Sequence, residues 1–119
     1  MIRKFLFLTA MCMASATGLL SMSSTEDMTV GATKDWYAIT SSSDGAKLAA
    51  VVRDGNIWTS ANPGATWTEN TSTGAAKDWR SITSSSDGRK LAAGVDGGNI
   101  WTSADWGATW TENTSTGAG

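Results

Sequence analysis

Apolar residues in this chain occur in short runs of two kinds. In one kind apolar and polar positions alternate, as in Asn-Ile-Trp-Thr at 56–59 and again at 99–102. In the other, apolar residues follow one another without interruption, as in Leu-Ala-Ala-Val-Val at 48–52. Alternation is typical of strands with one buried face, and a short unbroken run is typical of strands buried on both faces. No window after the N-terminal segment has the period of an amphipathic helix, so the pattern predicts an all-β chain.

Turn chemistry separates the runs. Asp-Gly pairs at 44–45 and 54–55, and Asp-Gly-Gly at 96–98, favour tight hairpins because Asp and Gly accept the backbone conformations that such turns need. The predicted strands of the first half are Trp36–Ser42, Lys47–Val52, Asn56–Ser60 and Thr66–Thr71, and those of the second half begin at Trp79, Lys90, Asn99 and Thr109.

The two halves are copies of each other. Residues 34–76 and 77–119 differ at nine of 43 aligned positions, and 43 residues is the length of one four-stranded blade of a β-propeller. A two-sheet sandwich would not require such a repeat. The sequence therefore predicts two four-stranded antiparallel blades, at 34–76 and 77–119, with the tryptophans filling the space between neighbouring blades.

Each copy carries the motif Ser-x-Asp/Asn-x-Gly-x-Thr-Trp between its third and fourth strands. Its residues are Ser60, Asn62, Gly64 and Trp67 in the first copy, and Ser103, Asp105, Gly107 and Trp110 in the second. The Asp or Asn side chain can accept hydrogen bonds from the backbone of the turn, and the Gly can adopt the positive φ that the turn needs. The motif resembles the BNR/Asp-box of sialidase-like, sortilin-like and photosystem-assembly-factor-like β-propellers. The resemblance implies a structural element of a propeller blade, not a catalytic site.

Two blades are too few for a closed propeller, which has about four to eight. The outer faces of a two-blade unit would leave tryptophans in contact with water, at a cost comparable to the stability of a whole domain. We therefore expect the chain to associate with itself, as a ring of three or four copies. The other interpretation is that the chain is a structural fragment of a longer propeller protein.

The first residues have the layout of a signal peptide. Arg3 and Lys4 precede an apolar run, and Ala14-Ser15-Ala16 is a small-x-small cleavage signal, so we expect cleavage near Ala16 and a secreted or extracytoplasmic protein. Residues 17–33 form a leader that includes a partial repeat tail at 26–32. A loose lipobox around Cys12 is an alternative, although Met11 occupies a position where such boxes have a small residue.

Composition excludes several functions. The net charge is −2, and removal of the signal would leave seven basic and eleven acidic residues, so no basic surface for nucleic acid is expected. The chain has no histidine, and its one cysteine, Cys12, lies in the signal, so we expect neither a metal site nor a cofactor. No membrane-spanning segment is expected, because the apolar run of the signal is too short.

Catalytic residues of the sialidase pattern are missing. That family uses three arginines, a tyrosine–glutamate pair and an aspartate, whereas the only tyrosine here, Tyr37, is replaced by Arg80 in the second copy. Carboxylate pairs among Asp44, Asp54, Glu69 and their counterparts could in principle support glycoside hydrolysis, but turn residues are the simpler interpretation. We expect no enzyme activity, with a sialidase-like glycosidase as the remote alternative.

Three residues are candidates for ligand binding. Trp106 occupies a turn position where the first copy has Pro63, so its ring is expected to be exposed and able to stack on a sugar or a protein partner; it could equally pack on its own blade. Tyr37 and Arg80 are the other two candidates. Asn70 and Asn113 lie in N-glycosylation sequons, which matter only in a host that glycosylates. The predicted function is a secreted, non-enzymatic propeller module that binds carbohydrate or protein, assembles into a ring, or both.

Overall fold

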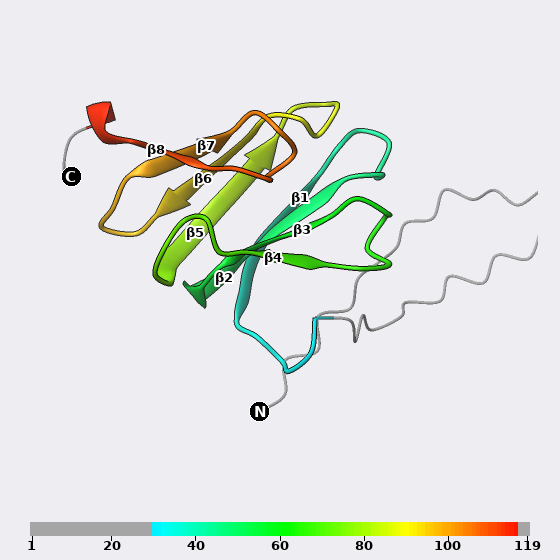
Figure 1. The fold of residues 1–119 in the computed structure, drawn as a ribbon, viewed down its shortest axis with the longest axis horizontal. Helices are drawn as coiled ribbons and strands as arrows, with labels where there is room; N and C mark the ends of the chain where they lie inside the picture. The colour runs from blue at the N-terminus through cyan, green and yellow to red at the C-terminus, as the bar shows by residue number, and fades with distance from the viewer. Residues whose placement is uncertain (1–29, 117–119) are drawn as a thin grey trace, which may run out of the picture.

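The computed structural model of the protein describes residues 30–116, and the predicted signal peptide and most of the leader lie outside them. The described chain is all-β and consists of two four-stranded antiparallel blades that lie side by side (Figure 1). The first blade contains β1 (Trp36–Ser41), β2 (Leu48–Gly55), β3 (Ile57–Ser60) and β4 (Thr68–Asn70). The second contains β5 (Lys77–Ser84), β6 (Leu91–Val95), β7 (Ile100–Ser103) and β8 (Thr111–Asn113).

Both blades have the same strand order and register. Within each blade every strand pairs with the next one along the chain, so β1 pairs with β2, β2 with β3 and β3 with β4. The pairing of β5 to β8 repeats this pattern, with every aligned partner displaced by 43 residues. This arrangement is that of an incomplete β-propeller, as the repeat length predicts.

The two blades are also joined at one edge. Arg53 pairs with Asp78 and Gly55 with Lys77, so a short ladder links the end of β2 to the start of β5 and makes one curled sheet. The sequence predicted a turn at Arg53–Gly55 and the end of the strand at Val52, and this boundary is wrong. Asp54 does adopt the positive φ of a turn, 54°, but its neighbours are drawn into a strand by their partners in the second blade.

Each blade has two unlike faces. One face, which we call the tryptophan face, carries Trp36, Trp58 and Trp67 in the first blade and Trp79, Trp101 and Trp110 in the second. The other, the aliphatic face, carries Ala49, Val51 and Ile57 in the first blade, and Ala92, Gly94 and Ile100 occupy the same positions in the second. The faces alternate because successive residues of a strand point to opposite sides of the sheet.

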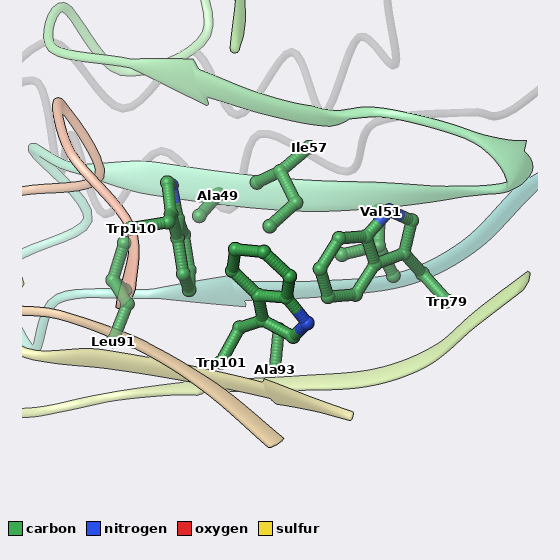
Figure 2. Packing of buried hydrophobic residues seen from close by; sticks show 8 residues of the cluster. All are labelled: Ala49, Val51, Ile57, Trp79, Leu91, Ala93, Trp101 and Trp110. Carbon is green, nitrogen blue, oxygen red and sulfur yellow. The ribbon is translucent and has the colours of Figure 1, made fainter. Parts of the chain in front are cut away.

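The main core lies between the blades, where the aliphatic face of the first meets the tryptophan face of the second (Figure 2). Val51, Ile57 and Trp79 are fully buried there, and the Trp79 indole N–H donates a hydrogen bond of 3.1 Å to the carbonyl of Gly55. Trp79 and Trp101 pack edge to face with ring centres 6.2 Å apart. The prediction that tryptophans fill the space between blades is confirmed for this junction.

The two faces outside this junction are the tryptophan face of the first blade and the aliphatic face of the second. The sequence predicted exposed tryptophans on the outer faces, and this is not what the structure has. Trp58 and Trp67 on the first blade are buried, with Val30 and Trp36 packed beside them and the Lys34 ammonium group 4.9 Å from the centre of the Trp58 ring. The open face is the aliphatic face of the second blade, where Ile100 is 46% exposed. For the same reason β6 is buried mainly on one face, whereas the prediction of burial on both faces is confirmed for β2.

Secondary structure otherwise follows the prediction, except that several strands stop one or two residues short of the predicted bounds and β5 begins at Lys77, two residues before its predicted start at Trp79. The prediction of no helix is wrong only at Thr114–Thr116, which forms one 3₁₀ turn after β8. The part of the chain between residues 30 and 116 contains no helix long and apolar enough to cross a membrane.

Candidate functional site

The Ser-x-Asp/Asn-x-Gly-x-Thr-Trp turns have the local geometry expected from the motif. In the second blade, Ser103 donates its hydroxyl to Asp105, and the same carboxylate accepts bonds from the backbone N–H of Thr109 at 2.9 Å and from its hydroxyl at 2.5 Å. The Gly107 N–H donates to Ser103 Oγ at 3.0 Å, and its φ of 85° is in the left-handed region. These bonds satisfy the polar groups of a loop that would otherwise have to be held by packing alone.

The first blade builds the equivalent turn with a neutral amide. Asn62 Oδ1 accepts from the Thr66 N–H at 2.9 Å, and Asn62 Nδ2 donates to the Thr66 hydroxyl at 2.8 Å. Gly64 has a φ of 82°. The two turns differ in charge: hydrogen bonds from Thr109 and Ser103 lower the pKa of Asp105 to about 2, so this turn holds a carboxylate across the physiological pH range.

Trp106 is held in an unusual backbone conformation at the tip of the second turn. Its φ is 58°, a value that bulky residues adopt rarely, and Gly107 follows with another positive φ, as in a type I′ turn. The Trp106 N–H donates to the carbonyl of Arg89 at 2.9 Å. The first copy has Pro63 here, whose ring fixes φ near −65° and which has no N–H to donate, so the two turns have different conformations.

The Trp106 side chain is 48% exposed, as expected for a turn tip, but it has a neighbour that the sequence analysis did not identify. The Arg89 guanidinium lies 5.5 Å from the centre of the Trp106 ring, and Arg89 Nε donates to the carbonyl of Ala104 at 3.1 Å. Trp106 also lines a cavity of about 50 Å³ between the blades, together with Leu48 and Leu91. The first copy has Ala46 and Pro63 in place of Arg89 and Trp106. That both positions differ between the copies was the signal in the sequence that could have indicated this contact.

Tyr37 and Arg80, the other two candidates, are brought together. Each is the extra residue of a β-bulge in the innermost strand of its blade, since the register shifts between Trp36 and Ala38 and again between Trp79 and Ser81. The Arg80 guanidinium lies 5.1 Å from the centre of the Tyr37 ring, and its Nη1 donates to the Tyr37 hydroxyl at 3.4 Å. Bulges of this kind redirect a side chain away from the regular face of a strand.

Two carboxylates complete this cluster. Arg80 Nη2 bonds Asp78 at 2.7 Å and Asp96 at 3.1 Å. The Tyr37 hydroxyl and the Asp78 carboxylate raise the pKa of Arg80, so its charge is permanent. Nearby, Arg53 pairs with Asp35 at 2.7 Å. The cluster offers an aromatic face beside a compensated cation, which suits a polar, uncharged ligand better than a strong anion.

The two sequon residues occupy different surroundings. Asn70 is half-buried, and its Nδ2 donates to the carbonyls of Gly107 and Ala108 in the other blade, whereas Asn113 is exposed at the end of β8. In both, the side-chain oxygen accepts bonds from the serine two residues later, at 2.9 and 2.6 Å in Asn70. Asn70 therefore ties the outer strand of the first blade to the turn of the second.

Other titratable groups are engaged in turns. Ser42 and Ser85 donate to Asp44 and Asp87, respectively, each at 2.6 Å, and these bonds, with the backbone N–H two residues on, lower the pKa of both carboxyl groups. Among the residues that the structure describes, no group of three or more His, Cys, Asp or Glu side chains is placed to hold a metal ion.

Comparison with known proteins supports the fold. No protein-family model matches the chain, and no curated protein is similar to it. Among solved structures, the GH74 enzyme of Niastella koreensis, a glycoside hydrolase of the β-propeller type, is similar with 28% sequence identity and a TM-score of 0.50. The similarity covers 62% of this chain and 11% of that one, so the chain corresponds to a small part of the larger protein. The match agrees with an incomplete propeller.

Proposed function

We propose that the chain is a non-enzymatic β-propeller module, exported from the cell, whose ring is completed by further copies of itself. The observation that supports this proposal is the open aliphatic face of the second blade: Ile100 is 46% exposed there, while Ile57 at the same position of the first blade is fully buried by the next blade. Because the aliphatic face of the first blade is buried by a neighbouring blade, we expect the aliphatic face of the second blade to be covered by a blade as well. Three or four chains would give rings of six or eight blades.

The mass of the purified protein in solution tests the assembly. Light scattering and native mass spectrometry over a range of concentrations are expected to give a discrete trimer or tetramer. A folded monomer at every concentration would contradict the proposal and would favour the alternative, a piece of a longer propeller protein whose other blades cover the open face.

We propose further that the ring binds a carbohydrate or a protein through its exposed aromatic residues, and that the motif turns are BNR/Asp-boxes with a structural role. Trp106 supports the binding role because a bulky residue with positive φ is strained, and strained residues gather at functional sites. Tyr37 beside Arg80 offers a second aromatic surface. A glycan array probed with the wild type and with Trp106→Ala tests this role: loss of binding in a folded variant supports Trp106, and unchanged binding excludes it.

The similarity to a GH74 enzyme favours one other candidate, a glycoside hydrolase. Retaining and inverting glycosidases both need a carboxyl group kept protonated as the general acid. Here hydrogen bonds lower the pKa of Asp44, Asp87 and Asp105, the opposite of what such an acid requires. Release of reducing ends from a panel of polysaccharides would overturn the non-enzymatic proposal, and no release by the assembled protein would support it.

Export rests on the N-terminal segment. N-terminal sequencing of material collected outside the cytoplasm is expected to begin just after Ala16. Recovery of Met1 on exported protein would contradict cleavage, and a lipid on Cys12 would identify a lipoprotein instead.

A further inference from the structure

The free surfaces of this chain match the two halves of its own internal junction. Within the chain, the aliphatic face of the first blade packs against the tryptophan face of the second. This leaves the aliphatic face of the second blade and the tryptophan face of the first at opposite ends of the pair. Two positions of the tryptophan face that are buried at the junction, Leu91 and Trp79, have half-buried counterparts in the first blade, Leu48 and Trp36. Trp58 and Trp67 are as buried in the first blade as Trp101 and Trp110 are at the junction.

The same relationship appears in the cavities. Seven residues of the first blade, between Thr40 and Ala61, line the cavity of about 50 Å³, which the second blade covers with residues that include Gly88 and Trp106. The seven residues that lie 43 positions later, between Thr83 and Ala104, line a groove of about 520 Å³ with no cover. The groove is thus the cavity before its covering blade is added.

We propose that a second copy of this chain covers that groove, docking the tryptophan face of its first blade on the aliphatic face of the second blade in the register of the internal junction. This inference rests on the proposed function, and it goes further by specifying which residues meet. The occupant is a second copy because the surface that already fits an aliphatic face in this structure is a tryptophan face of nearly identical sequence, and every copy carries a second such face.

Side-chain bonds to backbone carbonyls across the internal junction can be repeated between copies, whereas the Arg80–Tyr37 bond would have its two residue types exchanged. Asn70 Nδ2 donates to the Gly107 carbonyl, and Asn113 and Gly64 of the second copy would form the same pair. The Trp79 indole donates to the Gly55 carbonyl at 3.1 Å, and Trp36 of the second copy would reach the carbonyl of Gly98 in the same way. In each of these two pairs the residue types are identical, so these donors and acceptors would keep their partners.

Two substitutions make the proposed junction weaker than the internal one. Ala38 and Val51 are partners in the ladder of the first blade, and Ser81 and Gly94 replace them in the second. Val51 is fully buried at the internal junction, so its replacement by glycine removes apolar contact area. A serine and a glycine also make the free face more polar, which suits a surface that is exposed to water before assembly.

Charge is the other difference. Arg53 faces Asp78 across the internal ladder, whereas Asp96 would face Asp35 of the second copy. Each of these carboxylates has an arginine at its side: Arg80 lies 3.1 Å from Asp96, and Arg53 lies 2.7 Å from Asp35 within its own chain. Arg80 also pairs with Asp78 at 2.7 Å, so each carboxylate has a cation beside it and the group carries one net negative charge where the copies meet.

Two glycines provide a selective test. At Gly88 a Cβ atom would lie 2.8 Å from Lys47 Cβ across the internal junction, so no side chain fits. Gly45, its counterpart in the first blade, has no atom within 4 Å of that position and would meet Lys90 only in the proposed junction. Gly97 also has open space and a similar φ of 66°, and its counterpart Asp54 is an exposed residue between the two paired residues of the internal ladder, so a side chain at position 97 would fit beside the proposed junction. Asparagine accepts positive φ, so Gly45→Asn and Gly97→Asn are a matched pair.

Sedimentation velocity over a concentration series, with circular dichroism to confirm folding, tests the register. We expect Gly45→Asn to weaken association by about 10-fold or more, and Gly97→Asn to associate like the wild type. The double variant Ser81→Ala/Gly94→Val copies the Ala38–Val51 pair into the second blade and should tighten association by about 10-fold or more. Association that is indifferent to Gly45→Asn and to the double variant overturns the proposed register.

The same series separates this inference from the proposed function. If the wild type is an oligomer and neither Gly45→Asn nor Ser81→Ala/Gly94→Val changes its association, the ring of the proposed function stands and the proposed register is wrong. If the wild type stays monomeric, the ring of the proposed function fails, and the register is then decided by the double variant alone. Association of Ser81→Ala/Gly94→Val that is abolished by adding Gly45→Asn supports the register, and a monomeric double variant overturns it.

Discussion

The Arg89 guanidinium lies 5.5 Å from the centre of the Trp106 ring, and the two residues have no counterparts in the first copy, where Ala46 and Pro63 occupy their positions. The backbone joins them as well, since the Trp106 N–H donates to the Arg89 carbonyl at 2.9 Å. Two of the nine differences between the copies therefore form one contact. The contact holds an exposed ring over the cleft between the blades.

The first prediction concerns the strain at Trp106. Glycine normally destabilises a structure relative to alanine by about 0.5–1 kcal/mol, but a positive φ costs a non-glycine residue about 1–2 kcal/mol. We therefore expect Trp106→Gly to be more stable than Trp106→Ala, by roughly 1 kcal/mol, in chemical denaturation. Ala104→Gly, two residues earlier, is the control, and there we expect the glycine variant to be less stable than the protein with alanine. An alanine variant as stable as the glycine variant would mean that the tip is not strained.

The second prediction concerns acid. The folded-state pKa of Asp105 is about 2, below its unfolded value near 3.9. Its contribution to stability is therefore complete above pH 4 and is lost as the pH falls through about 2. Asp105→Asn, which copies Asn62 of the first turn, should melt slightly below the wild type at pH 7, because bonds to a carboxylate are stronger than bonds to an amide.

The measurement is a series of thermal melts of both proteins between pH 7 and pH 2. The difference between the two melting temperatures should shrink between pH 4 and pH 2. Asp44 and Asp87, whose pKa values are also lowered, remain in both proteins and cancel in the comparison. A difference that stays constant down to pH 2 would show that Asp105 does not carry this pH dependence.

The third prediction concerns Asn70. Asn70→Asp keeps the oxygen that accepts from Ser72 but replaces the amide that donates to Gly107 and Ala108 with a second acceptor. The Gly107 carbonyl keeps its bond from the Trp110 indole N–H at 3.1 Å, but the loss of the Asn70 bonds and the repulsion between the new carboxylate and the two carbonyls should cost about 1–3 kcal/mol in denaturant unfolding. Asn113→Asp makes the same change where the side chain is exposed. In dilute protein, where the chains do not associate, it should lower the free energy of unfolding by less than Asn70→Asp does. Equal losses in the two variants would place the effect of Asn70→Asp within its own loop.

Much of the fold could be predicted from the sequence because the repeat and its turn residues are local signals. The eight strands, their order within each blade and the positive φ of Gly64 and Gly107 follow from the repeat period and the turn chemistry. The extension of β2 through Asp54 could not be predicted, because it depends on pairing with β5 in the other blade. The one-sided burial of β6 likewise depends on which faces have a neighbour, a property of the whole chain.

The candidate site was predicted in part. Trp106 was found because it breaks the repeat, and Tyr37 and Arg80 because they replace each other at one position. Their contact required knowledge that β1 and β5 lie side by side, which single-strand patterns do not contain. Arg89 was missed although it also differs between the copies. Ser81 and Gly94 also differ between the copies, and only the structure shows that they are partners in the ladder between β5 and β6.

The last prediction concerns Trp79, the largest side chain with no exposure to solvent. It packs between the blades among Val51, Ile57 and Trp101, so Trp79→Ala should leave a cavity and cost about 3–5 kcal/mol, a large share of the 5–15 kcal/mol typical of a domain. Trp79→Phe keeps most of the ring but removes the N–H that bonds the Gly55 carbonyl, so it should cost about 1–3 kcal/mol. Denaturant unfolding at one protein concentration, followed by fluorescence and circular dichroism, measures both losses. A loss in Trp79→Ala no larger than that in Trp79→Phe would show that the hydrogen bond, not the packing, holds the blades together. If neither variant lost stability, the blades would not depend on this junction.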